Sequence, residues 1–412
     1  MLQLDMLQLD YVRSQFPSLD QGWVFMDNAG GSQIVQPVLT RLQDYLVTSN
    51  VQLGASYEIS QLASQRLKVA DQTAATLINA AEPSEIVMGP STSLLLRILA
   101  ISVGRYLQPG DEIIVTDCDH EANITPWLDL QRQGLVIKTW HTDPATLTLR
   151  IEDLVKLLSP RTRLVTLVHA SNVLGAINPI RQIADLVHQR GAWLCVDGVG
   201  FAPHQLIDVQ AMDVDFYAFS FYKVYGPHHA VLYGKRDCLL ALPGFNHDFV
   251  AEDDLPYKFQ PGGANYELSY ATQGISDYLS SLAGYHFKGQ AHSDLRGRLR
   301  QAFELMSQHE EQLCDRILSY LNAKPNVRII GPTVADRRQR VPTIAFTIDG
   351  VNSASIPPSV EHHHIAIRHG HFYAKRLIEA LKLRHGVVRV SLVHYNTLTE
   401  CDQLIECLDA LI

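Results

Sequence analysis

Short β-rich runs alternate with longer helical patterns from about residue 85 to residue 235, and this alternation restricts the fold more than any other feature. Parallel strands need long crossover connections, so strands that alternate with helices predict a mainly parallel sheet with helices on both faces. We expect helices over 151–158 and 180–190. The expected strands are 112–116, 135–140, 163–168, 192–197, 214–219 and 230–233. The sequence therefore predicts an α/β fold.

The pattern changes after about residue 285. A long helical stretch over 295–321 leads into expected strands near 327–330 and 343–346, and two helices flank the apolar run 387–392. This order is typical of a smaller α+β domain packed on the first. The sequence thus predicts three parts, namely a lead-in packing on the small domain (1–20), a large domain (21–285) and a small C-terminal domain (286–412).

Lys223 and Asp197 each stand at the end of an expected buried strand. In sheets of this kind ligands bind beyond the carboxyl ends of the strands. A buried lysine has a lowered pKa, which frees its amine to form a Schiff base. An aspartate at such a strand end can hold the pyridinium nitrogen of pyridoxal phosphate (PLP) in its protonated form. Together the two residues predict a PLP enzyme.

Two further segments fit that chemistry less specifically. Gly89–Ser93 precedes the helical run 94–103, and the N-terminus of a helix offers backbone N–H groups to a phosphate. The same residues also suit an ordinary helix cap. His120 follows the strand ending at Thr116, where its flat ring could stack on a cofactor, although a solvated acidic loop would have the same sequence.

Composition narrows the classes of protein that this chain can represent. The chain has 412 residues, 46% hydrophobic and 19% charged, as in an ordinary globular enzyme. A formal net charge of −9 argues against nucleic acid or an anionic membrane as a main partner. We expect no membrane-spanning segment or signal peptide. The six cysteines are scattered without metal-ligand spacing, which indicates reduced thiols and a cytoplasmic location.

From about Phe25 to its end the chain resembles the class V aminotransferase-type PLP enzymes of fold type I, in the branch of cysteine desulfurases and selenocysteine lyases. The resemblance implies a large domain with a mainly parallel seven-stranded sheet, a smaller C-terminal α+β domain and a homodimer with shared active sites. Six motifs in the family's order carry it, namely 27–30 (DNAG), 120–123 (HEAN), 171–175 (SNVLG), 197–198 (DG), 220–227 (SFYKVYGP) and 389–391 (RVS).

The resemblance also implies a role for individual residues. Lys223 carries the cofactor and later moves protons, while His120 stacks over the cofactor ring. Arg389 grips the substrate carboxylate, and Arg368 is a candidate second clamp. The segment 259–265 reaches the partner's phosphate site. The implied cofactor-binding residues are Ser91, Thr92, His120, Asn172, Asp197, Ser220, Tyr222, Lys223 and Gly263, and the implied substrate-binding residues are Asn28, Ala29, Arg368 and Arg389.

The chain departs from the desulfurase pattern where function is decided. Desulfurases carry a nucleophilic cysteine on a loop before the last substrate arginine, and we align Tyr373 with that cysteine. No cysteine stands between Cys314 and Cys401. A thiolate is the group that attacks the substrate sulfur, so persulfide formation in the family's manner is not expected. Gly200 replaces a frequent glutamine, and Tyr222 replaces a histidine before the lysine.

Five histidines crowd into 362–371, but consecutive histidines cannot all face one ion, and we expect no metal site. We expect the tract 362–364 at a helix end, with His369 and His371 at the substrate mouth.

The sequence therefore favours a PLP-dependent lyase that eliminates a β-substituent from a cysteine-type or other β-substituted amino acid. Transamination and epimerisation share the same early steps and stay open as alternatives. A non-catalytic PLP-fold binding protein is the alternative from another class.

Overall fold

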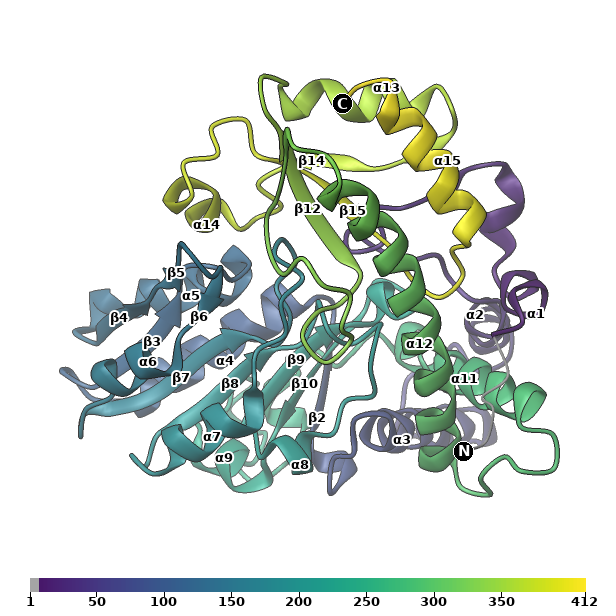
Figure 1. Cartoon of the computed structure of the whole chain (residues 1–412). Coiled ribbons are helices and arrows are strands. Elements are labelled where there is room, and N and C mark those ends of the chain that lie inside the picture. Colours follow the sequence, from purple (N-terminus) through teal and green to yellow (C-terminus); the bar gives the residue numbers. More distant parts are fainter. Residues whose placement is uncertain (1–6) are drawn as a thin grey trace.

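The computed structural model describes residues 7–412, and its centre is a seven-stranded sheet (Figure 1). β10 runs antiparallel to both its neighbours, whereas the other adjacent pairs are parallel. The predicted mainly parallel sheet is confirmed, and all six expected strands are present. The first strand in spatial order was not predicted. That order is β2 (Ile86–Gly89), β10 (Ala230–Gly234), β9 (Phe216–Ser220), β8 (Trp193–Asp197), β7 (Thr162–Val168), β3 (Glu112–Thr116) and β4 (Val136–Trp140).

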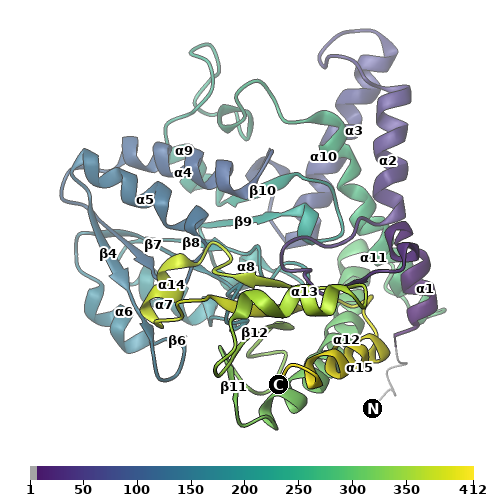
Figure 2. The ribbon, with the colours of Figure 1, turned by 90° about the horizontal axis from the view of Figure 1, so that it is seen from above.

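Helices cover both faces of this sheet. α4 (Thr92–Tyr106) and α5 (Thr125–Leu128) lie on one side, and α6 (Ile151–Leu157) and α7 (Ile180–His188) lie on the other (Figure 2). Alternate residues of each strand therefore enter two different cores. Phe216 packs with the α4 side, whereas Tyr217 packs with the α7 side. Burial on both faces explains why these strands read as continuous apolar runs.

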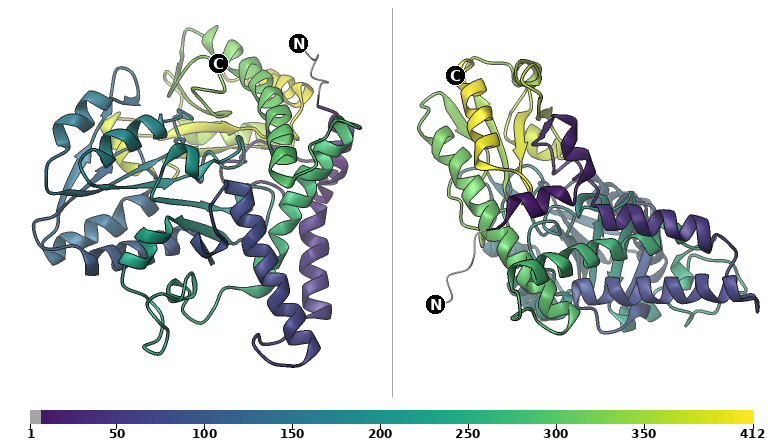
Figure 3. Two further views of the ribbon diagram at one scale, coloured as in Figure 1. Left: turned by 90° about the horizontal axis from the view of Figure 1, so that it is seen from below. Right: turned by 90° about the vertical axis from the view of Figure 1, so that its right-hand side faces the viewer.

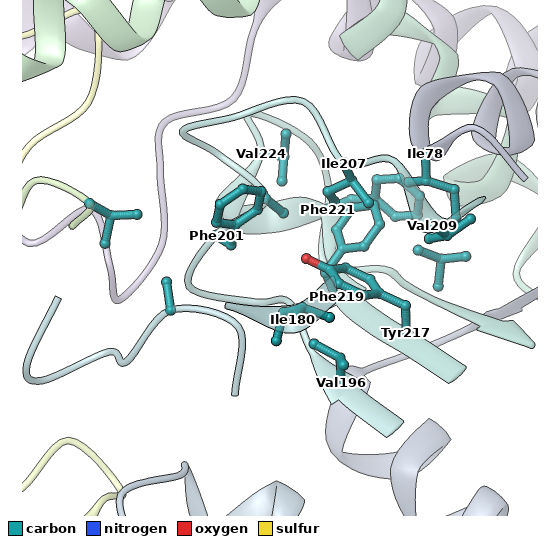
Figure 4. Close-up of a cluster of buried hydrophobic side chains, with 14 of the residues drawn as sticks. Ile78, Ile180, Val196, Phe201, Ile207, Val209, Tyr217, Phe219, Phe221 and Val224 are labelled. Atoms are coloured by element: carbon teal, nitrogen blue, oxygen red, sulfur yellow. The ribbon is translucent and has the colours of Figure 1, made fainter. Parts of the chain in front are cut away.

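The core on the α7 side extends to the loops beyond the strand ends. Figure 4 shows Val196, Tyr217 and Phe219 of the sheet beside Phe201 and Phe221, which belong to those loops. This packing fixes the segments that follow β8 and β9.

A second sheet of four antiparallel strands lies beyond the carboxyl ends of the parallel strands. Its order is β11 (Val327–Ile329), β12 (Thr343–Ile348), β15 (Val387–Ser391) and β14 (Arg368–Gly370). The long helix α12 (Leu295–Asn322) runs up to it from α11 (Gln273–His286) (Figure 1). The two predicted helices that flank residues 387–392 are α14 (Lys375–Ala380) and α15 (Leu398–Asp409). The predicted smaller α+β unit is thus confirmed.

The N-terminal segment connects the two sheets. Residues 1–6 of the predicted lead-in lie outside the described chain. α1 (Leu9–Ser14) stacks Tyr11 on Tyr285, with ring centroids 4.0 Å apart, and its Arg13 donates to the Tyr395 carbonyl at 2.8 Å. β1 (Val24–Phe25) then pairs with β13 (Ile365–Ala366) beside the smaller sheet. The boundaries drawn at residues 20 and 285 stay predictions.

α2 (Gln36–Thr48) and α3 (Glu58–Ile78) project beyond the rest of the molecule as an antiparallel pair (Figures 2 and 3). Several apolar side chains of this pair are exposed, namely Leu46, Val47, Ile59, Leu62 and Val69. Among residues 7–412, no helix combines the length and the hydropathy that a membrane crossing requires.

Candidate active site

The predicted site residues gather at the edge of the large sheet where its parallel strands end. β3 leads to His120, β7 to Asn172 and β9 to Lys223, while Asp197 is the last residue of β8. Parallel strands deliver their carboxyl ends to one edge, so residues that are about 100 positions apart in sequence meet there.

Lys223 lies in the short turn η5 (Phe221–Lys223) directly after β9 and is 8% exposed. Burial, reinforced by Arg389 and opposed by Asp197 and Asp27, lowers the pKa of its amine to about 8. Its Nζ lies 5.8 Å from the centroid of the Tyr222 ring. Within residues 7–412 its side chain makes no hydrogen bond or ion pair. The amine is therefore partly neutral near physiological pH, as Schiff-base formation requires.

Asp197 is 3% exposed, and its Oδ1 accepts the Val199 N–H at 2.9 Å. Burial raises the pKa of this carboxyl to about 6, against the lowering effects of the Val199 N–H and of Lys223. A buried carboxylate without a direct cation partner is costly unless a cationic group completes the site. Asp197 therefore fits a protonated ring nitrogen.

Asp119 is a second buried carboxyl that the sequence reasoning did not single out. It accepts hydrogen bonds from Thr116, Asn123 and the Val168 N–H, and burial raises its pKa to about 7. Its position directly before His120 was the available signal. It ties the His120 loop to β3 and β7.

His120 presents a neutral, flat ring. Its Nδ1 accepts the Ala122 N–H at 3.1 Å. Burial, together with the charges of Lys223 and Arg389 and against that of Glu121, lowers its pKa to about 4. The Tyr373 ring stacks on it, with centroids 4.9 Å apart and planes 30° apart. An uncharged imidazole held in this way suits ring stacking.

The predicted phosphate site is built from two hydroxyls and a helix end. Thr92 Oγ1 and Ser220 Oγ lie 2.7 Å apart, and both residues are buried. Ser91 caps α4 by accepting the Leu94 N–H at 3.2 Å, so the capping function is real, and the N–H groups of Thr92 and Ser93 at the start of the helix have no intrahelical acceptor. These two N–H groups and the two hydroxyls fit a phosphate dianion.

Tyr222 and Gly263, two other predicted cofactor residues, are held by contacts within the chain. The Tyr222 ring stacks on His228, with centroids 4.7 Å apart, and the Tyr222 carbonyl accepts the Ser32 N–H. Gly263 has a left-handed φ of 82° in a loop that Gln260 anchors to the Met88 carbonyl. The structure brings Gly263 into no hydrogen bond with Thr92 or Ser220 of the same chain.

Arg389 is 2% exposed and comes from β15 of the smaller sheet. It donates to Asp27 Oδ1 at 2.7 Å and to the Asn172 carbonyl at 3.2 Å, and the Phe372 ring lies 3.9 Å from its Cζ. Arg368, whose side chain is 59% exposed, donates to Asp27 Oδ2 at 3.4 Å. At this site the buried atoms Arg389 Nε and Asn172 Oδ1 have no hydrogen-bond partner in the described chain. Each of these two atoms can form a hydrogen bond with a ligand.

The Asn28 side chain and the Ala29 N–H are already hydrogen-bonded within the chain. The Asn28 amide donates to the Phe25 carbonyl, and its oxygen accepts the Tyr395 hydroxyl. The Ala29 N–H donates to Ser391 Oγ at 2.8 Å. The sequence reasoning missed the neighbouring Asp27, which contacts both arginines. The substrate-binding roles of Asn28 and Ala29 stay predictions.

All six cysteines are free, and none has the electrostatics of a nucleophile. Burial raises the pKa of every one of these thiols, to about 11 for Cys314 and about 12 for Cys238 and Cys401. The same direction holds for Cys118, Cys195 and Cys407. Reactive cysteines have lowered pKa values, so this chain offers no persulfide-forming thiol of the usual kind.

The histidine tract follows α13 (Ile356–Glu361), at a helix end as expected, and His364 stacks on Trp23. His371 lies edge-on to Tyr373, with centroids 6.3 Å apart. In the part of the chain that the structure describes, no group of three or more His, Cys, Asp or Glu side chains is arranged to hold a metal ion.

The family model for class V aminotransferases matches residues 24–404, almost the whole chain. The chain belongs to the class V aminotransferase family. An aminotransferase-like protein, FGM3, of Gibberella zeae is 42% identical, with 97% of this chain and 98% of the relative covered. The cysteine desulfurase-like protein ustD of Aspergillus flavus is 34% identical over 98% of this chain and 91% of its own. The crystal structure of the cysteine desulfurase CsdA from Escherichia coli superposes with a TM-score of 0.83, covers 98% of each chain and is 27% identical.

Class V aminotransferases are PLP-dependent enzymes that act on small amino-acid substrates, so the predicted cofactor and enzyme class are confirmed. The residues fit this cofactor. Asp197 matches the ring nitrogen, the unpartnered Asn172 Oδ1 can meet the ring hydroxyl, and Thr92 with Ser220 matches the phosphate. Lys223, buried and with a lowered pKa, would supply the amine that carries the cofactor.

Proposed function

We propose that this enzyme is a PLP-dependent lyase that expels a β-substituent, in the first instance a sulfur group, from a cysteine-type amino acid. The observation that carries the proposal is a contrast within the chain. The pKa of the buried Lys223 amine is lowered, whereas the pKa of each of the six thiols is raised. Elimination needs a base at Cα and no thiolate, so this residue set is sufficient for it.

Arg389 binds the substrate α-carboxylate through its planar guanidinium, using donors that are not saturated by Asp27. This contact orients the Cα–H bond. Lys223, whose pKa is about 8, takes the proton from Cα as the neutral amine. When bound, the cofactor supplies the electron sink that makes this proton acidic.

The β-substituent then leaves with the electrons of its bond to Cβ, as sulfide when the substrate is cysteine. Lys223, now protonated, holds the proton that was removed from Cα. Water completes the reaction, and the balance is cysteine plus water to pyruvate, ammonia and hydrogen sulfide.

The test is incubation of the holoenzyme with L-cysteine, cystine and cysteine sulfinate, with pyruvate and alanine measured separately. Pyruvate with ammonia supports elimination. Alanine with released sulfur or sulfite would show desulfuration instead and would overturn the proposal. Treatment with iodoacetamide should leave the pyruvate rate unchanged, because buried thiols of raised pKa react slowly.

A second candidate is transfer or elimination on an acidic amino acid. The observation that favours it is that Arg368 and Arg389 both contact the one carboxylate of Asp27, so a second acidic group on a substrate would find a cation. Transamination would produce a keto acid from one substrate and an amino acid from the co-substrate keto acid. A non-catalytic role is not retained, since class V aminotransferases are enzymes.

We also propose a cytoplasmic homodimer. The exposed apolar side chains of α2 and α3, together with the projection of this helix pair, support a contact with a second copy. In such a dimer the loop around Gly263 would serve the phosphate site of the partner. The six free thiols are those that a reducing compartment preserves.

A further inference from the structure

The loop between β14 and α14 contains two consecutive residues in a strained backbone conformation. Phe372 and Tyr373 have φ values of 49° and 59°, in the left-handed region that favours glycine. A side chain beyond glycine is disfavoured there because its Cβ crowds the backbone. Strain of this kind persists only where the surroundings hold it.

Contacts to the large domain hold this loop. The Phe372 carbonyl accepts Asn172 Nδ2 at 2.7 Å, and the Tyr373 carbonyl accepts the Glu121 N–H at 2.8 Å. Arg376 Nε then bonds Glu121 Oε1 at 2.9 Å. The loop is therefore fastened to the segments after β3 and β7, which carry His120 and Asn172.

The strained conformation sends the two aromatic rings to different places. Phe372, 7% exposed, lies beneath the Arg389 guanidinium, whereas Tyr373, 62% exposed, lies on the His120 ring.

We propose that Tyr373 is a positioning residue, whose ring covers the solvent side of His120 and holds the imidazole flat toward the cofactor. This inference rests on the proposed function for the task of His120. The loop then supplies the Tyr373 ring in place of a nucleophilic cysteine, and this ring packs on His120, the residue expected to stack on the cofactor.

Burial is the largest cause of the low pKa of His120, and the Tyr373 ring is part of what buries it. The charges that act on His120 are Lys223 and Arg389, which lower its pKa, and Glu121, which raises it. Removing the ring admits water and leaves these charges in place. The pKa of His120 should therefore rise toward 6.5.

The test uses the full-length apo-protein with isotope-labelled histidine, followed by NMR from pH 5.5 to 8, with His120 assigned through His120→Gln. In the wild type the His120 signal should not titrate in this range. In Tyr373→Ala it should titrate with a midpoint above 5.5, and Tyr373→Phe should behave as the wild type. Tyr106→Ala is the matched control, since Tyr106 is an exposed ring stacked on Trp193 away from the site.

A second readout is the dissociation constant of the cofactor, which should rise about fivefold in Tyr373→Ala and return in Tyr373→Phe, because a stacked ring pair contributes about 1 kcal/mol, a factor of about five in a dissociation constant. A Tyr373→Ala protein that folds, keeps His120 silent and binds the cofactor normally would overturn the inference. The NMR measurement needs no turnover, so it is independent of the pyruvate assay. If His120 titrates in Tyr373→Ala but the wild type forms no pyruvate, the proposed reaction is rejected and the positioning role of Tyr373 is kept.

Discussion

Arg368 and Arg389 stand directly opposite each other on the antiparallel strands β14 and β15, and one carboxylate, that of Asp27, bonds to both. Like charges at facing positions of a sheet repel. Asp27 offsets that repulsion and leaves the pair with one positive charge in excess. A substrate carboxylate bound at this pair, as proposed, would enter a site that already contains an anion and would still be attracted to it.

The two arginines should have separable effects. Arg389→Ala removes the guanidinium that is proposed to bind the substrate carboxylate, and we expect kcat/KM for every amino acid to fall about 100-fold or more, because truncating one partner of a buried charge pair costs binding about 2–5 kcal/mol. Arg368→Ala should leave cysteine turnover near wild type and weaken cysteine sulfinate about fivefold, because an exposed pair contributes about 1 kcal/mol or less. Steady-state kinetics on both substrates measure this. Equal losses for the two substrates in Arg368→Ala would contradict a second carboxylate clamp.

Cofactor loading of the apo-enzyme should depend on pH through Lys223. The reactive species is the neutral amine, and its pKa is about 8, so the rate of loading should rise from pH 6.5 and level off above 8 to 9. Stopped-flow absorbance gives the rate. Lys223→Ala should show no covalent loading at any pH, while Lys288→Ala, at the surface, should match the wild type. A flat profile in the wild type would refute the lowered pKa.

The lowered pKa of Lys223 also predicts how the free energy of unfolding of the apo-protein depends on pH. The folded-state pKa of Lys223 lies below the value of 10.5 for an unperturbed lysine, so between pH 8 and 10.5 the unfolded chain binds more protons and wild-type stability rises with pH. Below pH 8 the buried ammonium costs about 3 kcal/mol. Lys223→Met should therefore be more stable than the wild type at pH 7, with a difference that narrows toward pH 10. Urea unfolding at several pH values measures it, and a constant difference would count against this account.

Restoring the frequent family residue at position 200 should damage this chain. A Cβ at Gly200 would lie 2.4 Å from the Ala170 carbonyl oxygen, which is backbone and cannot turn away. We expect Gly200→Gln and Gly200→Ala to lower the free energy of unfolding by about 1–3 kcal/mol. Gly284→Ala, where a Cβ meets nothing within 4 Å, is the control. Unchanged melting of Gly200→Ala would show that the backbone there yields.

The proposed dimer predicts a charge-sensitive face on α3. Light scattering should give the mass of two chains for the wild type and of one chain for the double variant Leu62→Glu, Val69→Glu, because burying two carboxylates opposes association. Val155→Glu, an exposed valine on α6, should stay dimeric. A monomeric wild type would reject the proposal.

Much of the fold could be predicted because its signals are local. The strand around Phe216–Ser220 is apolar on both faces, and α7 follows the helical period, so each was predicted within a few residues. β2 was missed because its four residues are too short to show a period. Lys223 and Asp197 could be found from sequence because a charged residue at the end of a buried run is rare.

The sequence by itself determined the alternation of strands and helices, the lysine and the aspartate at the strand ends, and the lack of a cysteine in the loop before Arg389. Only the tertiary structure decided that Asp27 bonds Arg389 across 362 positions and that Tyr373 lies on His120. Periodicity and strand-end chemistry act between near neighbours in the chain. Contacts between distant segments depend on how two sheets and a strained loop pack together, and that packing is set by the whole core.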